Sequence, residues 1–567
     1  MRPVEAFLEI LRSEGIRRVF GNPGTTELPL LDALSGADDL EYVLGLQEGS
    51  VVAMADGYAR ATGTPSFVSL HVAAGLANGL VGMLNASRSR TPMVVVAGQQ
   101  DRRHLLQDPM LTADLVTLAS AAAKSAVEVQ QPYDLAPVLR RAFLLARQPP
   151  AGPVFVSVPM DLLDADDPVD LPARSRLTPP AAAGGVVEAA ALLAGARRPA
   201  IVAGDGVGRD GAVPALVEVA ELLGATVYHQ PMNDGVNFPG NHPLYAGMLL
   251  PRNSAIRAAL AGHDVIFVVG CHAFMPHHYS PGSAIPDGAA VVQVDSDPAE
   301  LGRNFAVAAG LVGSLPGTLR LLAAALDRRV PQAAARLAAA RVGAAARRAE
   351  VDADAVRRYG HAPLDPRAAA HAVAAGLPPD AVVVEEAITV GMELRRVLRQ
   401  DRPGSYVHTI GGGLGWGIGA AVGTRLGRPD RPVVAVLGDG CAMFGLQGLW
   451  TAAHHRVPVL FLVMNNGEYR TLKDTMDAAK SRSTATGRYL GLDLTQPSLD
   501  WSAAARLFGV RGLRVGSAAE LRDVVAGAAA LDGPLLVDVP VRSHADAHRS
   551  DAAVVGARPA PEPSVTV

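Results

Sequence analysis

The sequence predicts an α/β protein of three doubly wound domains, each built on a parallel sheet, in which the first and last domains are copies of one fold. Short unbroken apolar stretches recur along the chain, which is typical of parallel strands covered by helices on both faces. Segments long enough for a crossover helix separate these stretches. The third observation is an internal repeat, because the stretch Gly152 to Pro159 matches the stretch Gly533 to Pro540.

A second match supports the repeat. The amide pair at 99–100 lies seven and eight residues after Pro92, and the pair at 465–466 lies at the same spacing after Pro458. In both copies an apolar run separates the proline from the pair. Equivalent strands therefore end in equivalent polar residues in the two domains.

The N-terminal domain is predicted over residues 1–171. It begins with a helix within Met1 to Arg18, where acidic and apolar residues follow helical spacing. The segment Glu41 to Leu46 predicts a strand, and Glu48 opens the helix that follows it. The segment Ser66 to Leu70 predicts a further strand of the same sheet.

A central α/β domain is predicted over residues 182–326, after a Pro- and Ala-rich linker at Pro172 to Ala183. The segment Gln332 to Arg358 should form a surface helix that leads to the C-terminal domain at residues 360–542. The tail at 543–567 contains several prolines and polar residues, and we expect an ordered strap at most. The predicted central strands are Ala200 to Ala203, Val265 to Val269 and Ala290 to Val294.

Composition limits the class of protein. The chain has 567 residues and a net charge of −4, which gives no electrostatic reason to expect nucleic acid or an anionic membrane as a partner. No uninterrupted apolar stretch is long enough to cross a bilayer, and the helical N-terminus does not read as a signal peptide. The two cysteines, Cys271 and Cys441, exclude a disulfide framework and favour a cytoplasmic protein.

Two polar signatures follow adjacent predicted strands of the C-terminal domain. The strand Pro432 to Leu437 runs into Gly438-Asp439-Gly440, and the strand Val459 to Met464 runs into Asn465-Asn466. The stretch Cys441 to Arg456 is long enough for one crossover helix, so Asp439 and Asn466 should meet at the carboxyl edge of the sheet. Their oxygens suit Mg²⁺, and the glycines allow close approach of a diphosphate.

A second copy of the first signature serves as an internal control. Gly204-Asp205-Gly206 also follows an apolar strand, Pro199 to Ala203. The residue 27 positions after Asp205 is Met232, and no asparagine pair follows. We therefore expect a tight loop there and no metal site.

These signatures resemble the GDG…NN motif of thiamine diphosphate enzymes, and two copies of one domain around a central domain resemble their decarboxylase branch. Within that branch the chain is most similar to benzoylformate decarboxylases, from about Val4 to Val541. The matching segments are Phe20-Gly21-Asn22-Pro23-Gly24-Thr25, Leu46-Gln47-Glu48, Ala55-Asp56-Gly57-Tyr58-Ala59, Leu70-His71-Val72-Ala73-Ala74-Gly75, Ala97-Gly98-Gln99-Gln100 and Gly411-Gly412-Gly413-Leu414-Gly415.

The resemblance implies a cofactor site for thiamine diphosphate and Mg²⁺. Glu48 matches the glutamate that hydrogen-bonds the aminopyrimidine ring, although a glutamate at a helix N-terminus also complements the helix dipole. Leu414 matches the apolar residue that holds the cofactor bent, and the backbone of Gly412 should accept a hydrogen bond from its amine. The further cofactor-binding residues implied are Thr389, Gly440, Cys441, Asn466 and Tyr469. The implied metal ligands are Asp439, Asn466 and the backbone carbonyl of Glu468.

The resemblance also implies residues that act on the substrate. His71 and His277 match a proton-transfer pair, with His278 as an alternative to His277. Thr25 stands where a serine grips the substrate carboxylate. Imidazoles that titrate near neutral pH suit the protonation of a carbanion and the deprotonation of an alcohol. His454 and His455 lie in the crossover segment, and we expect them to be structural or exposed to solvent.

Several positions depart from the family pattern. Cys441 replaces the usual serine, which puts that diphosphate contact in question. Aromatic positions of the substrate pocket are His408 and Thr475 in this chain, and a small residue there is Thr471. The predicted pocket is therefore more polar and less aromatic than a pocket for an unsubstituted phenyl ring.

The function implied is the non-oxidative decarboxylation of a small-molecule 2-oxo acid, benzoylformate-like, to an aldehyde, with carboligation as a possible second outcome. The alternatives are an acetolactate synthase-type carboligase, an acyl-CoA lyase and a non-catalytic cofactor-binding relative. Intact Glu48, Asp439 and Asn466 argue against the last, and His71 argues against the first. The resemblance implies a homodimer or homotetramer in which Glu48 of one subunit faces Asp439 of another.

Overall fold

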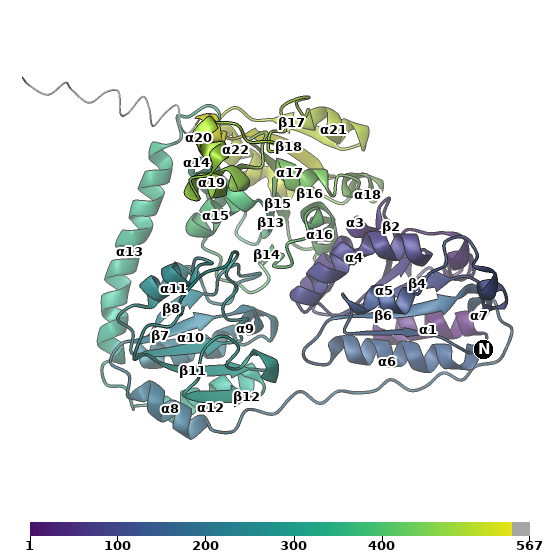
Figure 1. Cartoon of the computed structure of the whole chain (residues 1–567), viewed down its shortest axis with the longest axis horizontal. Coiled ribbons are helices and arrows are strands. Elements are labelled where there is room, and N and C mark those ends of the chain that lie inside the picture. Colours follow the sequence, from purple (N-terminus) through teal and green to yellow (C-terminus); the bar gives the residue numbers. More distant parts are fainter. Residues whose placement is uncertain (547–567) are drawn as a thin grey trace, which may run out of the picture.

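The computed structural model describes residues 1–546, and these form three six-stranded sheets flanked by helices. Every pair of neighbouring strands within the three sheets is parallel. Figure 1 shows the three units side by side, with the first unit at the right, the second at the lower left and the third at the top. The predicted fold class, three doubly wound α/β domains, is confirmed.

The first unit has the strand order β2-β1-β3-β4-β6-β5. Its strands are β1 (Arg18–Gly21), β2 (Glu41–Leu44), β3 (Ser66–Leu70), β4 (Met93–Gln99), β5 (Ser125–Glu128) and β6 (Pro153–Pro159). Its helices are α1 (Pro3–Glu14), α2 (Leu28–Ser35), α3 (Glu48–Thr62), α4 (Val72–Arg88), α5 (Leu115–Ser120), α6 (Leu135–Arg147) and α7 (Met160–Leu163), with 3-10 turns η1 (Thr25–Glu27), η2 (Arg102–Gln107) and η3 (Pro132–Asp134). The strand predicted to reach Leu46 ends at Leu44, one residue before Gly45.

The third unit has the order β14-β13-β15-β16-β18-β17, which matches the first unit position by position. Its strands are β13 (Val382–Glu386), β14 (Tyr406–His408), β15 (Val433–Gly438), β16 (Val459–Asn465), β17 (Arg511–Arg514) and β18 (Leu535–Pro540). Its helices are α14 (Pro366–Gly376), α15 (Ile388–Val397), α16 (Trp416–Gly427), α17 (Asp439–Met443), α18 (Gly448–His454), α19 (Arg470–Ala478), α20 (Arg482–Thr486), α21 (Trp501–Leu507) and α22 (Ala518–Ala526), with η5 (Gly527–Ala530). The repeat read from the sequence is thus a repeat of topology.

The central unit has the order β12-β11-β10-β7-β8-β9, so β9 and β12 are its edge strands. Its strands are β7 (Pro199–Ala203), β8 (Thr226–His229), β9 (Tyr245–Met248), β10 (Val265–Val269), β11 (Ala290–Asp295) and β12 (Ala309–Val312). Its helices are α8 (Val186–Ala194), α9 (Asp205–Arg209), α10 (Val213–Leu223), α11 (Asn253–Leu260) and α12 (Leu315–Leu326), with η4 (Pro298–Glu300). The predicted loop at 204–206 is wrong in part, because Asp205 begins the short helix α9 and accepts a hydrogen bond from the backbone N–H of Asp234.

Two connections join the units. Residues 164–185 contain no helix or strand and cross the molecule as an extended linker, seen along the bottom of Figure 1. The long helix α13 (Ala333–Arg357) runs along the left edge of Figure 1 from the central unit to the third, as predicted. The predicted strap at 543–567 is described only as far as Asp546, so residues 547–567 of it lie outside the described residues. Within residues 1–546 no helix is long and apolar enough to span a membrane.

The first and third units pack through α3 and α16, which share one apolar core. A Cβ on Gly423 would lie 1.8 Å from the carbonyl oxygen of Met54, and one on Gly57 would lie 2.1 Å from the carbonyl oxygen of Ala420. Gly419 faces Ser50 near the start of both helices, so the two helices run in the same direction. The N-terminus of α3 and that of α16 therefore lie at the same end of the pair.

The crossover between β15 and β16 differs from the prediction. A single helix was expected within Cys441 to Arg456, but two short helices, α17 and α18, flank a break at residues 444–447. A Cβ on Gly445 would lie 2.2 Å from the carbonyl oxygen of Gly415. The helix is interrupted for one turn here, and the interruption allows the loop before α16 to approach the backbone of Gly445 closely.

Candidate active site

Asp439 lies at the carboxyl end of β15 and is 3% exposed. Its Oδ1 accepts a hydrogen bond from the backbone N–H of Gly440 at 2.9 Å, and Oδ2 accepts one from Gly467 at 2.7 Å. Burial raises the pKa of Asp439 to about 6, against backbone N–H groups that lower it. No basic side chain of the described residues forms an ion pair with this carboxylate, which leaves it suited to a bound cation.

Asn466 lies beside Asp439, because β15 and β16 are neighbours and Gly438 pairs with Met464. Gly467, with φ of 68°, turns the chain back so that its N–H reaches Asp439. The Oδ1 of Asn466 accepts a hydrogen bond from the backbone N–H of Glu468 at 3.0 Å. The structure thus brings the two predicted metal ligands to one edge of the sheet.

The side chain of Glu468 is committed elsewhere. Its Oε2 lies 2.5 Å from Nζ of Lys473, and its Oε1 accepts a hydrogen bond from the backbone N–H of His544 at 2.5 Å. The backbone carbonyl takes no part in these contacts, and it stays the predicted metal ligand of this residue. A carboxylate, an amide oxygen and a carbonyl are hard ligands, and together with the unpaired charge on Asp439 they fit Mg²⁺.

The residues predicted to hold the diphosphate follow three adjacent strands, β13, β15 and β16. A Cβ on Gly440 would lie 2.7 Å from the ring of Tyr469, so only glycine fits between the ring and the chain. Burial raises the pKa of Cys441, which keeps a thiol and not a thiolate beside the site. Thr389, in the first turn of α15, lies 3.3 Å from the hydroxyl of Thr471. These surroundings fit a diphosphate, with the thiol as a weak donor in place of a hydroxyl.

The loop before α16 is held by the first unit. Gly412 is exposed with φ of 78°, and Leu414 follows it, half-buried. Asn85 of α4 donates to the carbonyl of Gly413 at 2.8 Å and accepts from its N–H at 3.0 Å. Asn85 was not predicted, since its partner lies 328 residues further along the chain.

Glu386 is a further buried carboxyl that the sequence did not single out. Its two oxygens accept hydrogen bonds from the backbone N–H groups of Trp416 and Gly417, at 3.1 and 2.9 Å. Burial raises its pKa to about 8 against these hydrogen bonds. Glu386 therefore fixes the N-terminus of α16 to the end of β13.

Glu48 is the first residue of α3, as predicted, and is half-buried. Its Oε2 accepts a hydrogen bond from Nδ2 of Asn78 at 3.0 Å. A Cβ on Gly75 would lie 3.4 Å from its Oε1. Since α3 and α16 run in the same direction, Glu48 and Leu414 lie at the same end of the helix pair.

His71 is held by a carboxylate that the sequence analysis missed. Its Nδ1 lies 2.9 Å from Oε2 of Glu27, which is 3% exposed. The hydroxyl of Thr26 donates to Oε1 of Glu27 at 2.6 Å and lies 3.1 Å from the same ring nitrogen. The backbone N–H groups of Gly24 and Gly98 complete the carboxylate's contacts, each at 3.0 Å. Thr25, the predicted substrate contact, is exposed at the start of the same turn.

His277 lies in the loop between β10 and β11 and is exposed. Its Nδ1 is 3.1 Å from Nε2 of His278, and the backbone N–H of His277 donates to the carbonyl of Pro251 at 3.2 Å. No hydrogen bond in the described residues joins it to His71. The structure therefore places the two predicted histidines on different units. His454 is exposed and stacks on Trp450, as expected for a structural residue.

His408 and Thr475, two positions that differ from the family pattern, carry polar groups in the structure. His408 is buried, and burial lowers its pKa to about 4, so the ring is neutral. Its Nδ1 bonds the carbonyl of Glu385 at 2.9 Å, while no described residue bonds its Nε2. Thr475 is exposed on α19 and bonds the carbonyl of Thr471 at 2.8 Å.

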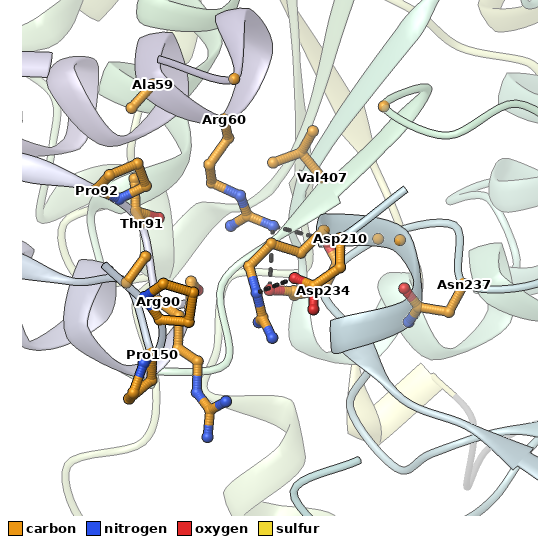
Figure 2. A pocket seen from close by; sticks show the side chains of 18 of the residues that line it. Ala59, Arg60, Arg90, Thr91, Pro92, Pro150, Asp210, Asp234, Asn237 and Val407 are labelled. Carbon is orange, nitrogen blue, oxygen red and sulfur yellow. Dashed lines mark hydrogen bonds and ion pairs between the residues drawn. The ribbon is translucent and has the colours of Figure 1, made fainter. Parts of the chain in front are cut away.

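A cavity of about 480 Å³ lies where the three units meet, beside the C-terminal end of α3. Figure 2 shows Arg60, near the C-terminus of α3, reaching toward Asp234 across it. Arg60 donates to the carbonyl of Asp234 at 2.7 Å and to that of His408 at 2.8 Å. Glu48 lies at the other end of α3, so this cavity is not the predicted cofactor site.

Comparison with known proteins gives matches to three family models. These are the N-terminal binding domain of thiamine pyrophosphate enzymes at residues 1–118, their central domain at 186–322 and their C-terminal binding domain at 389–539. A benzoylformate decarboxylase of Pseudomonas aeruginosa is 35% identical over 95% of this chain and 98% of its own length. A putative acetolactate synthase large subunit of Mycobacterium tuberculosis is 28% identical over 96% of this chain and 99% of its own.

Solved structures agree. A thiamine diphosphate-dependent 4-hydroxybenzoylformate decarboxylase of Rhodococcus jostii has a TM-score of 0.84 and 33% identity, over 96% of this chain and 99% of its own. A benzoylformate decarboxylase of Polynucleobacter necessarius has a TM-score of 0.86 and 29% identity over the same shares. With all three domain models matched in order, the chain belongs to the thiamine diphosphate-dependent enzyme family.

Proposed function

We propose that the chain is a thiamine diphosphate- and Mg²⁺-dependent decarboxylase that converts a 2-oxo acid to an aldehyde and CO₂ without oxidation. The observation that carries this proposal is the contact between His71 and Glu27, at 2.9 Å. A buried carboxylate fixes one ring nitrogen, which leaves Nε2 to transfer a proton on the unit that also carries Glu48. Decarboxylation to an aldehyde needs such a group, because a proton must replace the CO₂ that leaves.

The chain's own residues would divide the work. Asp439, Asn466 and the carbonyl of Glu468 would bind Mg²⁺, and Gly440, Cys441, Thr389 and Tyr469 would hold the diphosphate. Glu48 would hydrogen-bond the pyrimidine ring, with Leu414 and Gly412 orienting it. When bound, thiamine diphosphate supplies the electron sink that allows the carbon–carbon bond to break. His71 would then deliver a proton from Nε2, and Thr25 and His277 would contact the substrate.

The proposed substrate is a benzoylformate-like 2-oxo acid. Two of the similar proteins are named benzoylformate decarboxylase, and a third is named a 4-hydroxybenzoylformate decarboxylase. The neutral ring of His408 and the hydroxyls of Thr471 and Thr475 give this chain more polar groups to offer a substituted ring. Carboligation is the second candidate, favoured by the acetolactate synthase relative that matches nearly the whole chain.

We also propose that the working enzyme is a homodimer or homotetramer in the cytoplasm, with a small-molecule substrate and no nucleic acid or membrane partner. Both cysteines are free and buried, which suits a reducing compartment. In the proposed dimer, Glu48 of one protomer faces Asp439 of its partner. Each active site would then need both protomers.

The test is CO₂ release from a panel of 2-oxo acids with thiamine diphosphate and Mg²⁺, with products identified by mass spectrometry. The panel includes benzoylformate, its hydroxylated relatives, pyruvate, and branched-chain and acidic 2-oxo acids. We expect CO₂ and a stoichiometric aldehyde from an aromatic member. CO₂ with a 2-hydroxy ketone would instead support the carboligase, and no CO₂ from any member with the cofactor bound would contradict both.

Glu48→Gln is the control variant for this assay. It removes the carboxylate but keeps the side-chain shape, so the cofactor should still bind while turnover falls about a hundredfold or more. Cofactor retention is read from the thiamine diphosphate content of the purified protein. Full turnover in Glu48→Gln would contradict the role assigned to this residue.

A further inference from the structure

A second cavity, of about 290 Å³, lies between the edge strand β9, the helix α13 and the helix α15. We call it the arginine cavity, because five of the residues that line it are Arg347, Arg348, Arg395, Arg396 and Arg399. Neither aspartate nor glutamate lines it within the described chain. It adjoins the long helix at the left of Figure 1, outside the predicted cofactor site.

Three of these arginines have acidic partners just beyond the walls. Arg395 pairs with Glu385, Arg396 with Glu393 at 3.0 Å, and Arg399 with Asp352 at 2.6 Å. Each of these three arginines has a different carboxylate as its partner, so their charges are largely neutralised.

Arg347 and Arg348 are different. No carboxylate of residues 1–546 forms an ion pair with either side chain, and Arg348 donates only to the carbonyl of Asn241, at 3.1 Å. Both lie mid-way along α13, away from the charged ends of that helix. Two uncompensated guanidinium groups therefore face one small cavity, which favours a carboxylate or phosphate as a ligand.

The remaining walls are apolar. Met248, Leu250, Val351 and Met392 also line the cavity, and Leu250 is 37% exposed. Such walls favour a ligand with an apolar body over a fully hydrated inorganic ion. The volume is at the lower end of the range for small-molecule pockets, which excludes a dinucleotide.

The strand beside the cavity also has space for a ligand. β9 pairs only with β8, so its outer edge has backbone groups without a strand partner. Gly247 in this strand has φ of 117°, and no atom lies within 4 Å of the place that its Cβ would take. A small polar ligand can occupy this open space and form hydrogen bonds with the backbone groups at the strand edge.

The larger junction cavity of Figure 2 does not show the same imbalance. Arg60 pairs with Asp234 and Arg209 with Asp210, and all four of these residues line that cavity. The C-terminal ends of α3 and α6 also line it, and helix C-termini oppose a bound anion. The arginine cavity is therefore the better site for an anion.

The arginine cavity connects to the predicted cofactor site through α15. Arg395 lines the cavity from the last turn of this helix and donates to the hydroxyl of Tyr406 at 2.7 Å, which in turn donates to Glu385 at 2.8 Å. Glu385 accepts a hydrogen bond from the N–H of Ala387, the N-cap of α15, at 2.6 Å. Thr389 lies in the first turn of α15, about 9 Å along the axis from Arg395.

We propose that the arginine cavity binds an organic anion, a carboxylate on a small apolar body, and that its occupant acts on the cofactor-binding end of α15. The carboxylate meets Arg347 and Arg348, and the apolar body packs on Met248, Leu250 and Met392. Such a ligand would be an effector of the enzyme and not its substrate. The binding half of this proposal stands independently of the proposed reaction.

The test uses calorimetric titration of the full chain, loaded with thiamine diphosphate and Mg²⁺, with benzoate as the probe. Acetate and inorganic phosphate are the comparison probes, since they offer the anion without the apolar body. We expect benzoate to bind at least tenfold more tightly than either. Phosphate or acetate binding as tightly as benzoate would overturn the assigned ligand class.

The double variant Arg347→Ala, Arg348→Ala removes the two uncompensated charges, and alanine preserves the helix. We expect benzoate binding at this site to weaken by about tenfold or more, while Arg341→Ala, an exposed arginine of the same helix outside the cavity, leaves it unchanged. Leu250→Glu, which adds a negative charge at the cavity mouth, should have the same effect as the double variant. Unchanged isotherms in both variants would overturn the site.

Coupling is measured by kcat at saturating substrate as benzoate is added. The wild type should show a change in kcat with the concentration dependence seen by calorimetry, and the double variant should not. Benzoate binding without any change in kcat would overturn the effector role, while the assignment of the binding site would stand. Benzoate that competes for the active site is recognised separately, because it raises KM and does so equally in the wild type and the double variant.

Discussion

Among single residues, Glu27 has the clearest role that the sequence did not predict. Its carboxylate takes four hydrogen bonds, from Thr26, His71 and two backbone N–H groups. The residue looks like an ordinary acidic residue in the first turn of a helix, and His71 lies 44 residues further on. Only the folded sheet brings the ends of β1, β3 and β4 together, so spacing alone could not have identified this contact.

Glu27→Gln tests whether this carboxylate positions His71. The amide has a single acceptor oxygen, so it cannot accept hydrogen bonds from the His71 ring and from both backbone N–H groups at once. We therefore expect kcat to fall about ten- to a hundredfold with little change in KM. A double-mutant cycle with His71→Ala supplies the control. If Glu27 acts through His71, the double variant loses no more than His71→Ala alone; additive losses would contradict this role.

Glu386 allows a prediction for pH. Burial raises its pKa from 4.5 to about 8, so the folded protein holds this proton more tightly than the unfolded chain. The contribution of Glu386 to the free energy of unfolding is full below the pKa of this carboxyl in the unfolded chain, and it is lost as pH rises through about 8. Glu386→Gln cannot ionise, and its unfolding midpoint in the cofactor-free protein should change less between about pH 5 and pH 9 than that of the wild type.

Thermal unfolding followed by circular dichroism across this pH range is the measurement. Glu188→Gln, at an exposed position on α8, is the matched control and should follow the wild type. Equal pH dependence in Glu386→Gln and the wild type would show that this carboxyl is not the titrating group.

At the scale of elements, the strands were easier to predict than what connects them. Runs such as Val433 to Leu437 are buried on both faces, so composition alone marks them, and the placement of Asp439 beside Asn466 follows from two such strands. The crossover after Asp439 is broken because Gly445 makes room for the backbone of Gly415. That contact joins distant segments, and no local pattern indicates it.

The α3–α16 contact gives a prediction at this scale. A Cβ on Gly423 would lie 1.8 Å from a carbonyl oxygen, so Gly423→Ala forces the two helices apart. We expect the free energy of unfolding to fall by at least about 1–3 kcal/mol and cofactor binding to weaken. Urea unfolding measures the first, and Gly533→Ala, where no atom lies near the added Cβ, is the control. Equal stability of the two variants would contradict the close packing.

At the scale of the whole molecule, the two outer units share one sheet order but carry different polar residues at the same edge. The first presents Glu48 and His71, and the third presents Asp439 and Asn466. Repeated segments predicted this duplication. The arginine cavity could not be predicted, since it joins β9, α13 and α15, which lie far apart in the chain.

The proposed dimer predicts complementation between two inactive variants. Glu48→Gln and Asp439→Asn each lack one half of the site, but a mixed dimer with sites shared between protomers regains one complete site. When equal amounts of the two variants are refolded together, half of the dimers contain one protomer of each variant. One of the two sites in such a dimer is intact, so the activity should reach about a quarter of that of the wild type. No recovery in verified mixed dimers would place each complete site within a single chain.

The glycines between α3 and α16 also restrict how this enzyme can evolve. Any single base change that replaces a glycine either adds a side chain or stops the chain, and at Gly57 and Gly423 even the smallest side chain meets a carbonyl oxygen. No single base change at these positions gives a residue that preserves the contact, whereas Thr475 is exposed, and a new side chain there meets no such clash. Under selection for a new substrate, we expect the joint between the domains to stay fixed and the pocket residues to change.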